Sequence, residues 1–104
     1  MDQAKYITLA KVDSLPDGGA ASFVVGDKVI ALFRQGNEYF AISDICPHMG
    51  ASLAAGHFEH GVVTCPWHAW RFKVCDGTWC DNPVIKTDAY EVRVIDDAIQ
   101  VRIE

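Results

Sequence analysis

The sequence lacks the features of several protein classes. No run approaches the roughly 18 apolar residues that a membrane-spanning helix needs. The first residues, 1–6, have neither the basic nor the apolar segment of a secretory signal, so we expect a cytoplasmic protein that does not associate with membranes. Basic residues are few: Lys and Arg number 9 against 14 Asp and Glu, a net charge of −5. This balance argues against nucleic acid as a partner and favours a positively charged protein.

Helical periodicity is scarce as well. The 104 residues allow one domain, which we expect to span 1–104. Only 13–15 and 50–55 have the composition for a helical turn, and neither is long enough to be stable without tertiary packing. Turn residues separate short apolar segments at close intervals, which is typical of an all-β fold, a small antiparallel sandwich or barrel. The strands expected from this pattern are 20–25, 28–34, 38–43, 62–64, 70–74, 89–95 and 98–103.

One segment carries a distinctive pair of motifs. Cys46-Pro47-His48 is followed, after sixteen intervening residues, by Cys65-Pro66-Trp67-His68. Each arm offers one thiolate and one imidazole, and a proline after each cysteine biases that cysteine toward an extended conformation. Two such loop tips can hold one inorganic group between them.

The donor set is compatible with two different groups. Two cysteines and two histidines can bind one zinc ion, although structural zinc sites usually pair Cys with Cys and His with His. A [2Fe–2S] cluster with two His in place of two Cys is the alternative. In that cluster Cys46 and Cys65 would bind one iron, and His48 and His68 the other.

With its C-x-H and C-x-x-H motifs and both prolines, the chain resembles the Rieske iron–sulfur family. Further similarities are Gly50, the hairpin over 56–61, Phe72, the turn at 76–77 and a proline-containing segment at 81–83. The resemblance covers the whole chain. It implies a Rieske fold in which a cluster-binding subdomain, about 44–83, is inserted between strands. It also implies one [2Fe–2S] cluster with Cys46, His48, Cys65 and His68 as ligands.

The resemblance is greatest to the soluble Rieske ferredoxins of bacterial ring-hydroxylating oxygenases. It implies a one-electron carrier that takes electrons from a flavin reductase and passes them to a terminal oxygenase. Such a chain is not an enzyme by itself, and we expect a monomer when it is free. The alternatives are the small subunit of an assimilatory nitrite reductase and a redox-silent zinc-binding module.

The residues around the motifs also carry expectations about the reduction potential. High-potential Rieske proteins have an additional disulfide and place Ser and Tyr hydroxyls against the cluster. The matching positions here are Ala51 and Trp67 for the disulfide, and Trp70 and Phe72 for the hydroxyls. Hydrogen bonds to the cluster sulfurs raise the potential, so their loss predicts the low end of the Rieske range, about −150 mV.

Several other polar residues invite a functional interpretation. Cys75 and Cys80 flank a turn; a disulfide across this hairpin is the alternative, but we expect free thiols there. Two histidines and a glutamate in 57–60 have the composition of a non-haem iron triad, but a solvated hairpin is the expected structure. The acidic residues Asp44 and Glu59 are expected either to help dock a partner or to be solvated.

Overall fold

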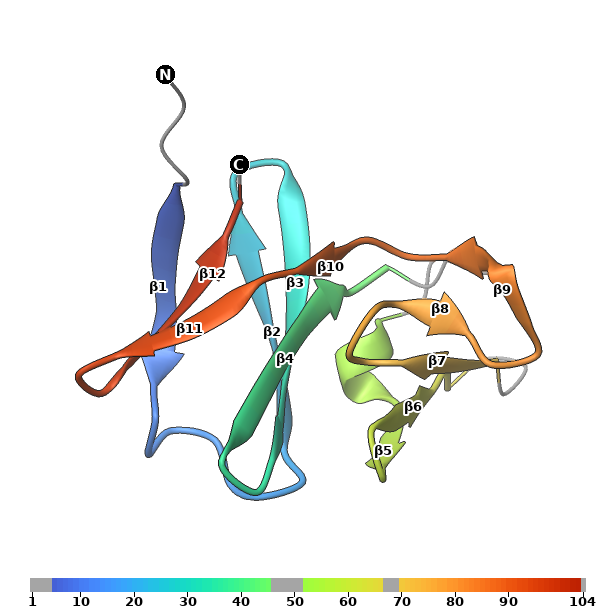
Figure 1. Cartoon of the computed structure of the whole chain (residues 1–104), viewed down its shortest axis with the longest axis horizontal. Helices are drawn as coiled ribbons and strands as arrows, with labels where there is room; N and C mark the ends of the chain where they lie inside the picture. The colour runs from blue at the N-terminus through green and yellow to red at the C-terminus, as the bar shows by residue number, and fades with distance from the viewer. Residues whose placement is uncertain (1–4, 46–51, 67–69, 104) are drawn as a thin grey trace.

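The computed structural model describes residues 5–45, 52–66 and 70–103. It contains three antiparallel sheets and one short 3-10 helix, η1 (Leu53–Ala55) (Figure 1). The strands are β1 (Tyr6–Lys11), β2 (Ala20–Val25), β3 (Lys28–Gln35), β4 (Glu38–Ser43), β5 (His57–Glu59), β6 (Val62–Thr64), β7 (Arg71–Lys73), β8 (Thr78–Trp79), β9 (Asn82–Lys86), β10 (Ala89–Tyr90), β11 (Val92–Ile95) and β12 (Ala98–Arg102).

The middle sheet, in the order β10-β4-β3-β2, is covered on both faces. Successive side chains of a strand point to opposite faces, and in β3 four consecutive residues, 30–33, are fully buried. Ile30 and Leu32 belong to one core, while Ala31 and Phe33 belong to another. The unbroken apolar run in β3 therefore reflects a central strand packed on two sides.

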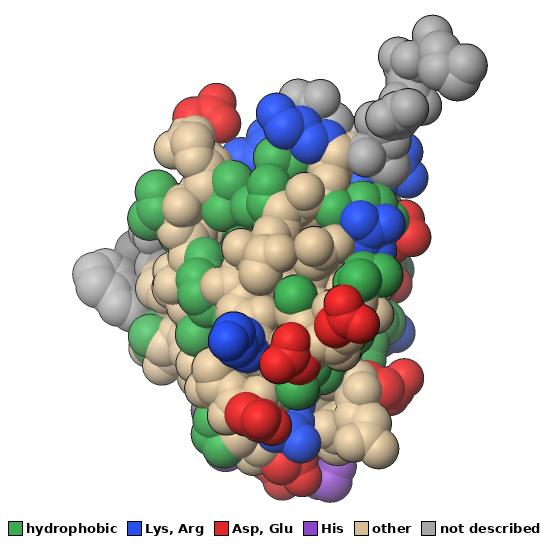
Figure 2. All heavy atoms as spheres, turned by 90° about the vertical axis from the view of Figure 1, so that its left-hand side faces the viewer, with side chains coloured by type: hydrophobic (Ala, Val, Ile, Leu, Met, Phe, Trp, Pro, Cys, Tyr) green, Lys and Arg blue, Asp and Glu red, His purple; other side chains and the backbone are tan. Residues whose placement is uncertain are grey.

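The first core lies between the middle sheet and the three-stranded sheet β1-β12-β11. Ile99 and Val101 of β12 pack there with Ile30, Leu32 and Ala41. These two sheets form the sandwich predicted from the sequence. Figure 2 shows the face of the molecule nearest the three-stranded sheet, on which acidic and basic side chains are interspersed.

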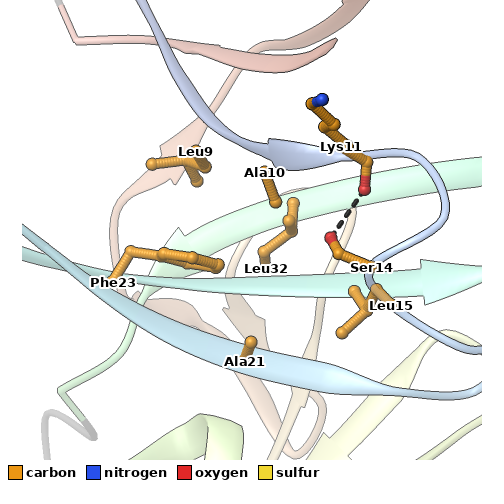
Figure 3. Close-up of a pocket in the computed structure, with 8 residues that line it drawn as sticks. All are labelled: Leu9, Ala10, Lys11, Ser14, Leu15, Ala21, Phe23 and Leu32. Carbon is orange, nitrogen blue, oxygen red and sulfur yellow. Dashed lines mark hydrogen bonds between the residues drawn. The ribbon is translucent and has the colours of Figure 1, made fainter. Parts of the chain in front are cut away.

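A hollow of about 390 Å³ opens into this sandwich between β1 and the middle sheet. The Ser14 hydroxyl donates to the carbonyl of Lys11 at 2.6 Å and closes the turn at its rim (Figure 3). Most of the side chains that face the hollow are apolar, so it offers packing surface and no set of metal donors. The lining residues are Leu9, Ala10, Lys11, Ser14, Leu15, Ala21, Phe23 and Leu32.

The second core lies between the middle sheet and the five-stranded sheet β5-β6-β7-β8-β9. This sheet is built from chain between β4 and β10, and β10 pairs with β4 through Ala89 with Ile42 and Tyr90 with Ala41. The N–H of Ser43 also donates to the carbonyl of Asp88 at 2.8 Å. The five-stranded sheet is thus an insertion whose two ends leave and rejoin the middle sheet side by side (Figure 1).

Six of the seven predicted strands are observed within one residue of their predicted bounds, and the seventh is divided; β1, β8 and β9 were not predicted. The sequence predicts one strand over 89–95, but this segment divides at Glu91 into β10 and β11. The two pieces pair in different sheets, β10 with β4 and β11 with β12, so the chain changes sheets at this point. The turn expected within 50–55 is η1, and none of the helices in the described parts of the chain has the length and apolar character to cross a membrane.

Candidate metal centre

Of the four predicted ligands, the structure describes one. Cys46, His48 and His68, with Ala51 and Trp67 beside them, lie outside the described residues. Cys65 directly follows β6, and its side chain is 1% exposed. It packs in the second core, so its thiol faces the interior and not the solvent.

The second predicted loop is closed at its base. The backbone N–H of Cys65 donates to the carbonyl oxygen of Trp70 at 2.6 Å. This bond continues the ladder between β6 and β7, in which Val63 pairs with Phe72. Cys65 and Trp70 therefore stand opposite each other where the loop leaves the sheet, and His68 belongs to the short segment between them.

The first predicted loop is closed in a similar way. Ile45 and Ser52 form an isolated antiparallel bridge, and the N–H of Leu53 donates to the carbonyl oxygen of Asp44 at 2.7 Å. The six residues 46–51, which include Cys46 and His48, lie between these two ends. Each motif thus occupies a loop whose base is held by backbone hydrogen bonds.

A carboxylate binds both ends of the first loop. Asp44 is 3% exposed, and its Oδ2 accepts hydrogen bonds from the hydroxyls of Ser22 at 3.0 Å and Ser52 at 2.7 Å. Its Oδ1 accepts from the N–H of Ala54 at 2.8 Å. The expectation that Asp44 docks a partner or is solvated is therefore wrong, because the side chain is buried and fully engaged. The sequence carried no signal for this role, since Ser22 is 22 residues away.

The bases of the two loops meet in one apolar core. Leu53, which follows the first loop, and Cys65, which begins the second, pack there with Val63, Phe72 and Val74. A cysteine thiolate is a ligand for both zinc and the iron of [2Fe–2S] clusters, and a bond to a metal offsets the cost of placing its charge among apolar side chains. The one donor that the structure describes therefore fits a bound metal group between the loops.

One face of the five-stranded sheet carries the residues nearest the second loop. Phe72 pairs with both Val63 and Trp79, so these three side chains share a face, as does Cys65 two residues beyond Val63. Phe72 is fully buried and contributes no hydroxyl. Trp70 and Trp79 stack on this face.

The segment 57–60, which contains two further histidines, is a surface hairpin, as expected. His57 and His60 both approach the carboxylate of Glu59, at 2.9 and 3.3 Å, and all three side chains are largely exposed. The hydrogen bond from His57, together with the charges of both histidines, lowers the pKa of Glu59. Among the residues that the structure describes, no group of three or more His, Cys, Asp or Glu is arranged to hold a metal ion.

The turn between β7 and β8 is tightly built. Cys75 is exposed there and Cys80 lies beyond β8, and both are free thiols, as expected. Gly77 has a φ of +77°, and its N–H donates to the carbonyl of Lys73 at 2.8 Å. Asn82 and Pro83, from the proline-containing segment 81–83 noted in the sequence, begin strand β9. Pro83 is tolerated because β9 is the edge strand of its sheet.

Comparison with known proteins assigns the family. A family model for the Rieske [2Fe–2S] domain matches residues 5–98. The chain is 33% identical over 101 residues to the anthranilate 1,2-dioxygenase ferredoxin subunit of Burkholderia cepacia, covering 96% of this chain and 94% of that protein.

Solved structures agree with the match. The ferredoxin of carbazole 1,9a-dioxygenase from Nocardioides aromaticivorans superposes with a TM-score of 0.88 at 31% identity, over 94% of this chain and 97% of that one. A candidate NADH-dependent nitrite reductase small subunit from Mycobacterium tuberculosis gives a TM-score of 0.89 at 26% identity, over 99% and 98%. With its two closed loops and its buried cysteine, the chain belongs to the Rieske family of [2Fe–2S] domains.

Proposed function

We propose that this protein is a one-electron carrier that accepts electrons from a flavin reductase and delivers them to a terminal oxygenase. The observation that carries the proposal is the 33% identity to a dioxygenase ferredoxin subunit, and the family match over 5–98 agrees with it. The extent of that similarity supports it, because 96% of this chain aligns with 94% of a protein that is itself an electron-transfer component. The protein is a component of an oxidoreductase system and is not itself an enzyme.

We assign the cluster ligands to the two loops. Cys46 and Cys65 would bind one iron, and His48 and His68 the other, within a subdomain of about 44–83 in a single domain 1–104. The backbone closures at the base of each loop support this assignment, because they bring the chain on either side of each motif together. When bound, a [2Fe–2S] cluster takes up and releases one electron.

The protein around the loops favours a low reduction potential. Phe72 lies in the core beside Cys65 and offers no hydroxyl to a cluster sulfur. An apolar shell disfavours the additional negative charge of the reduced state, as does a protein with a net charge of −5. We therefore expect a potential near the low end of the Rieske range, about −150 mV. Such a carrier would operate in the cytoplasm beside its reductase.

Electron paramagnetic resonance tests the proposal directly. Protein purified without oxygen should be silent when oxidised and, after dithionite, should give a rhombic signal with the low average g of a histidine-ligated cluster. Iron and sulfide should each be present at about two per chain. A colourless sample with one zinc per chain would contradict the proposed function. A reduction potential far above 0 mV would contradict the expected low potential.

A nitrite reductase small subunit is the second candidate. The structural similarity to the mycobacterial protein, over nearly the whole of both chains, favours it. The two candidates differ in how they bind their partners. A ferredoxin should dissociate from its oxygenase during gel filtration, whereas a reductase subunit should elute with its large subunit as a stable complex.

A further inference from the structure

We propose that Asp44 is a positioning residue that fixes the first cluster loop and lowers the reduction potential through its buried charge. The inference rests on the proposed function and adds to it a residue that is not a ligand. It comes from three hydrogen bonds and the burial of one carboxylate, all within the described chain.

The hydrogen bonds of Asp44 join three separate parts of the fold. Ser22 belongs to β2 in the middle sheet, whereas Ser52 and Ala54 lie where the first loop ends and η1 begins. Asp44 itself stands at the start of that loop. One side chain therefore ties both ends of the loop to the sheet beneath it.

The backbone of Asp44 reinforces this arrangement. Its N–H donates to the carbonyl of Val29 in β3 at 2.8 Å, and its carbonyl accepts from the N–H of Leu53 at 2.7 Å. Backbone and side chain together give Asp44 five hydrogen bonds to three parts of the chain: β2, β3 and the segment 52–54. The residue has little freedom to move, so the direction in which the chain leaves toward Cys46 is set here.

The carboxylate also lies close to the proposed ligand in the sequence. Two residues of extended chain span at most about 7 Å, which bounds the distance between the Cα atoms of Asp44 and Cys46. The charge is buried, so solvent screens it little. A buried negative charge on the residue from which the chain enters the loop opposes the arrival of an electron, which lowers the reduction potential.

Replacement of Asp44 by Asn separates the positioning of the loop from the effect of the negative charge. The amide oxygen of the Asp44→Asn variant still accepts from the Ala54 N–H, and its NH₂ group can donate to the Ser22 and Ser52 hydroxyls, which also act as acceptors. Geometry is then largely kept while the charge is lost. Asp44→Ala removes both, and leaves the donors of Ser22, Ser52 and Ala54 without an acceptor.

The experiment compares these variants as purified holoprotein, with Asp13→Asn as the matched charge control. Asp13 is an exposed carboxylate in the turn after β1, outside the inserted sheet. We measure iron and sulfide per chain, the g values, and the reduction potential by redox titration. Asp44→Asn should give wild-type g values with a raised potential, and Asp13→Asn should leave both unchanged. Asp44→Ala should lose at least half of its cluster.

Two results would overturn the inference. One is an Asp44→Ala variant with wild-type cluster content and potential. The other is an Asp44→Asn variant whose potential moves no further than that of Asp13→Asn. Hydrogen exchange of the Leu53 and Ala54 amides provides a readout that needs no cluster: Asp44→Ala should exchange them at least tenfold faster. If the wild type itself carries no cluster, the proposed function fails, while this exchange still tests the positioning.

Discussion

The indole rings of Trp70 and Trp79 are stacked, with 3.8 Å between ring centroids and 6° between planes. Trp70 ends the second loop and Trp79 lies on β8, so the stack joins the loop to a strand further along the sheet. The Trp79 Nε1 is buried and has no hydrogen-bond partner among the residues described. The ring of Trp79 therefore contributes through packing and not through its polar atom.

Two substitutions of Trp79 should separate the contribution of ring packing from that of the indole N–H. Trp79→Phe keeps an aromatic ring against Trp70 and removes an unsatisfied donor, so its unfolding free energy should stay within about 1 kcal/mol of wild type. Trp79→Ala removes the stack and should destabilise the protein by about 2–4 kcal/mol. Urea unfolding followed by far-UV circular dichroism measures both. Equal destabilisation by the two variants would mean that the indole N–H has a partner.

Gly77 should tolerate no side chain. Its φ of +77° is unfavourable for other residues, and a Cβ there would overlap the carbonyl oxygen of Thr87. We expect Gly77→Ala to cost about 2–4 kcal/mol of unfolding free energy.

Gly18→Ala is the matched control for that substitution. Gly18 has a nearly identical φ of +79°, but nothing lies within 4 Å of the position that a Cβ would take. The destabilisation should therefore reflect backbone strain alone, about 1 kcal/mol. If thermal or urea unfolding gave the same loss for both variants, close approach to Thr87 would not matter.

Asp76 should make stability depend on pH in the acidic range. Its carboxylate accepts from the hydroxyl of Thr78 at 2.7 Å and from the N–H of Thr78 at 3.0 Å, and these bonds lower its pKa. A carboxyl with a lowered folded-state pKa stabilises the protein above its unfolded pKa, near 3.9. That stabilisation is lost as the pH falls through the folded-state value.

Removal of the Asp76 carboxyl should therefore flatten the acid side of the stability curve. Urea midpoints of Asp76→Asn and wild type, measured from pH 7 to pH 2, should differ most above pH 4 and converge below. The difference should not exceed about 1 kcal/mol, because the carboxylate is exposed. A constant difference at all pH values would show that Asp76 acts by geometry and not by its charge.

The cysteines should fall into two classes. Cys65→Ser should lose the cluster, because a buried hydroxyl is a poor substitute for a thiolate ligand. A Cys75→Ser and Cys80→Ser double variant should keep wild-type iron, sulfide and potential, since Cys75 is exposed and both are free thiols. Iron and sulfide analysis distinguishes the classes. Loss of iron from the double variant would contradict the ligand assignment.

The sequence predicted the sandwich well, but not how the bases of the two motif-bearing loops are held. Turn residues such as Gly26-Asp27 mark strand ends locally, so β2, β3 and β4 were predictable. Strand β1 has no turn signal before it, and β8 is only two residues long, so neither was anticipated. The role of Asp44 depends on Ser22, a partner from another strand, and no local pattern encodes such a contact. Contacts between residues far apart in the sequence, such as Asp44 and Ser22, therefore determine how the loops are held.

The adjacency of β4 and β10 has a consequence for how such proteins can diversify. Since the chain departs and returns at neighbouring positions, the length of the inserted segment imposes no strain on the sandwich. Residues can be added or removed within it while Ser43 and Asp88 stay bonded. The sandwich can thus keep its shape, while the inserted segment between β4 and β10 is free to vary in size and in the surface that it presents to other proteins.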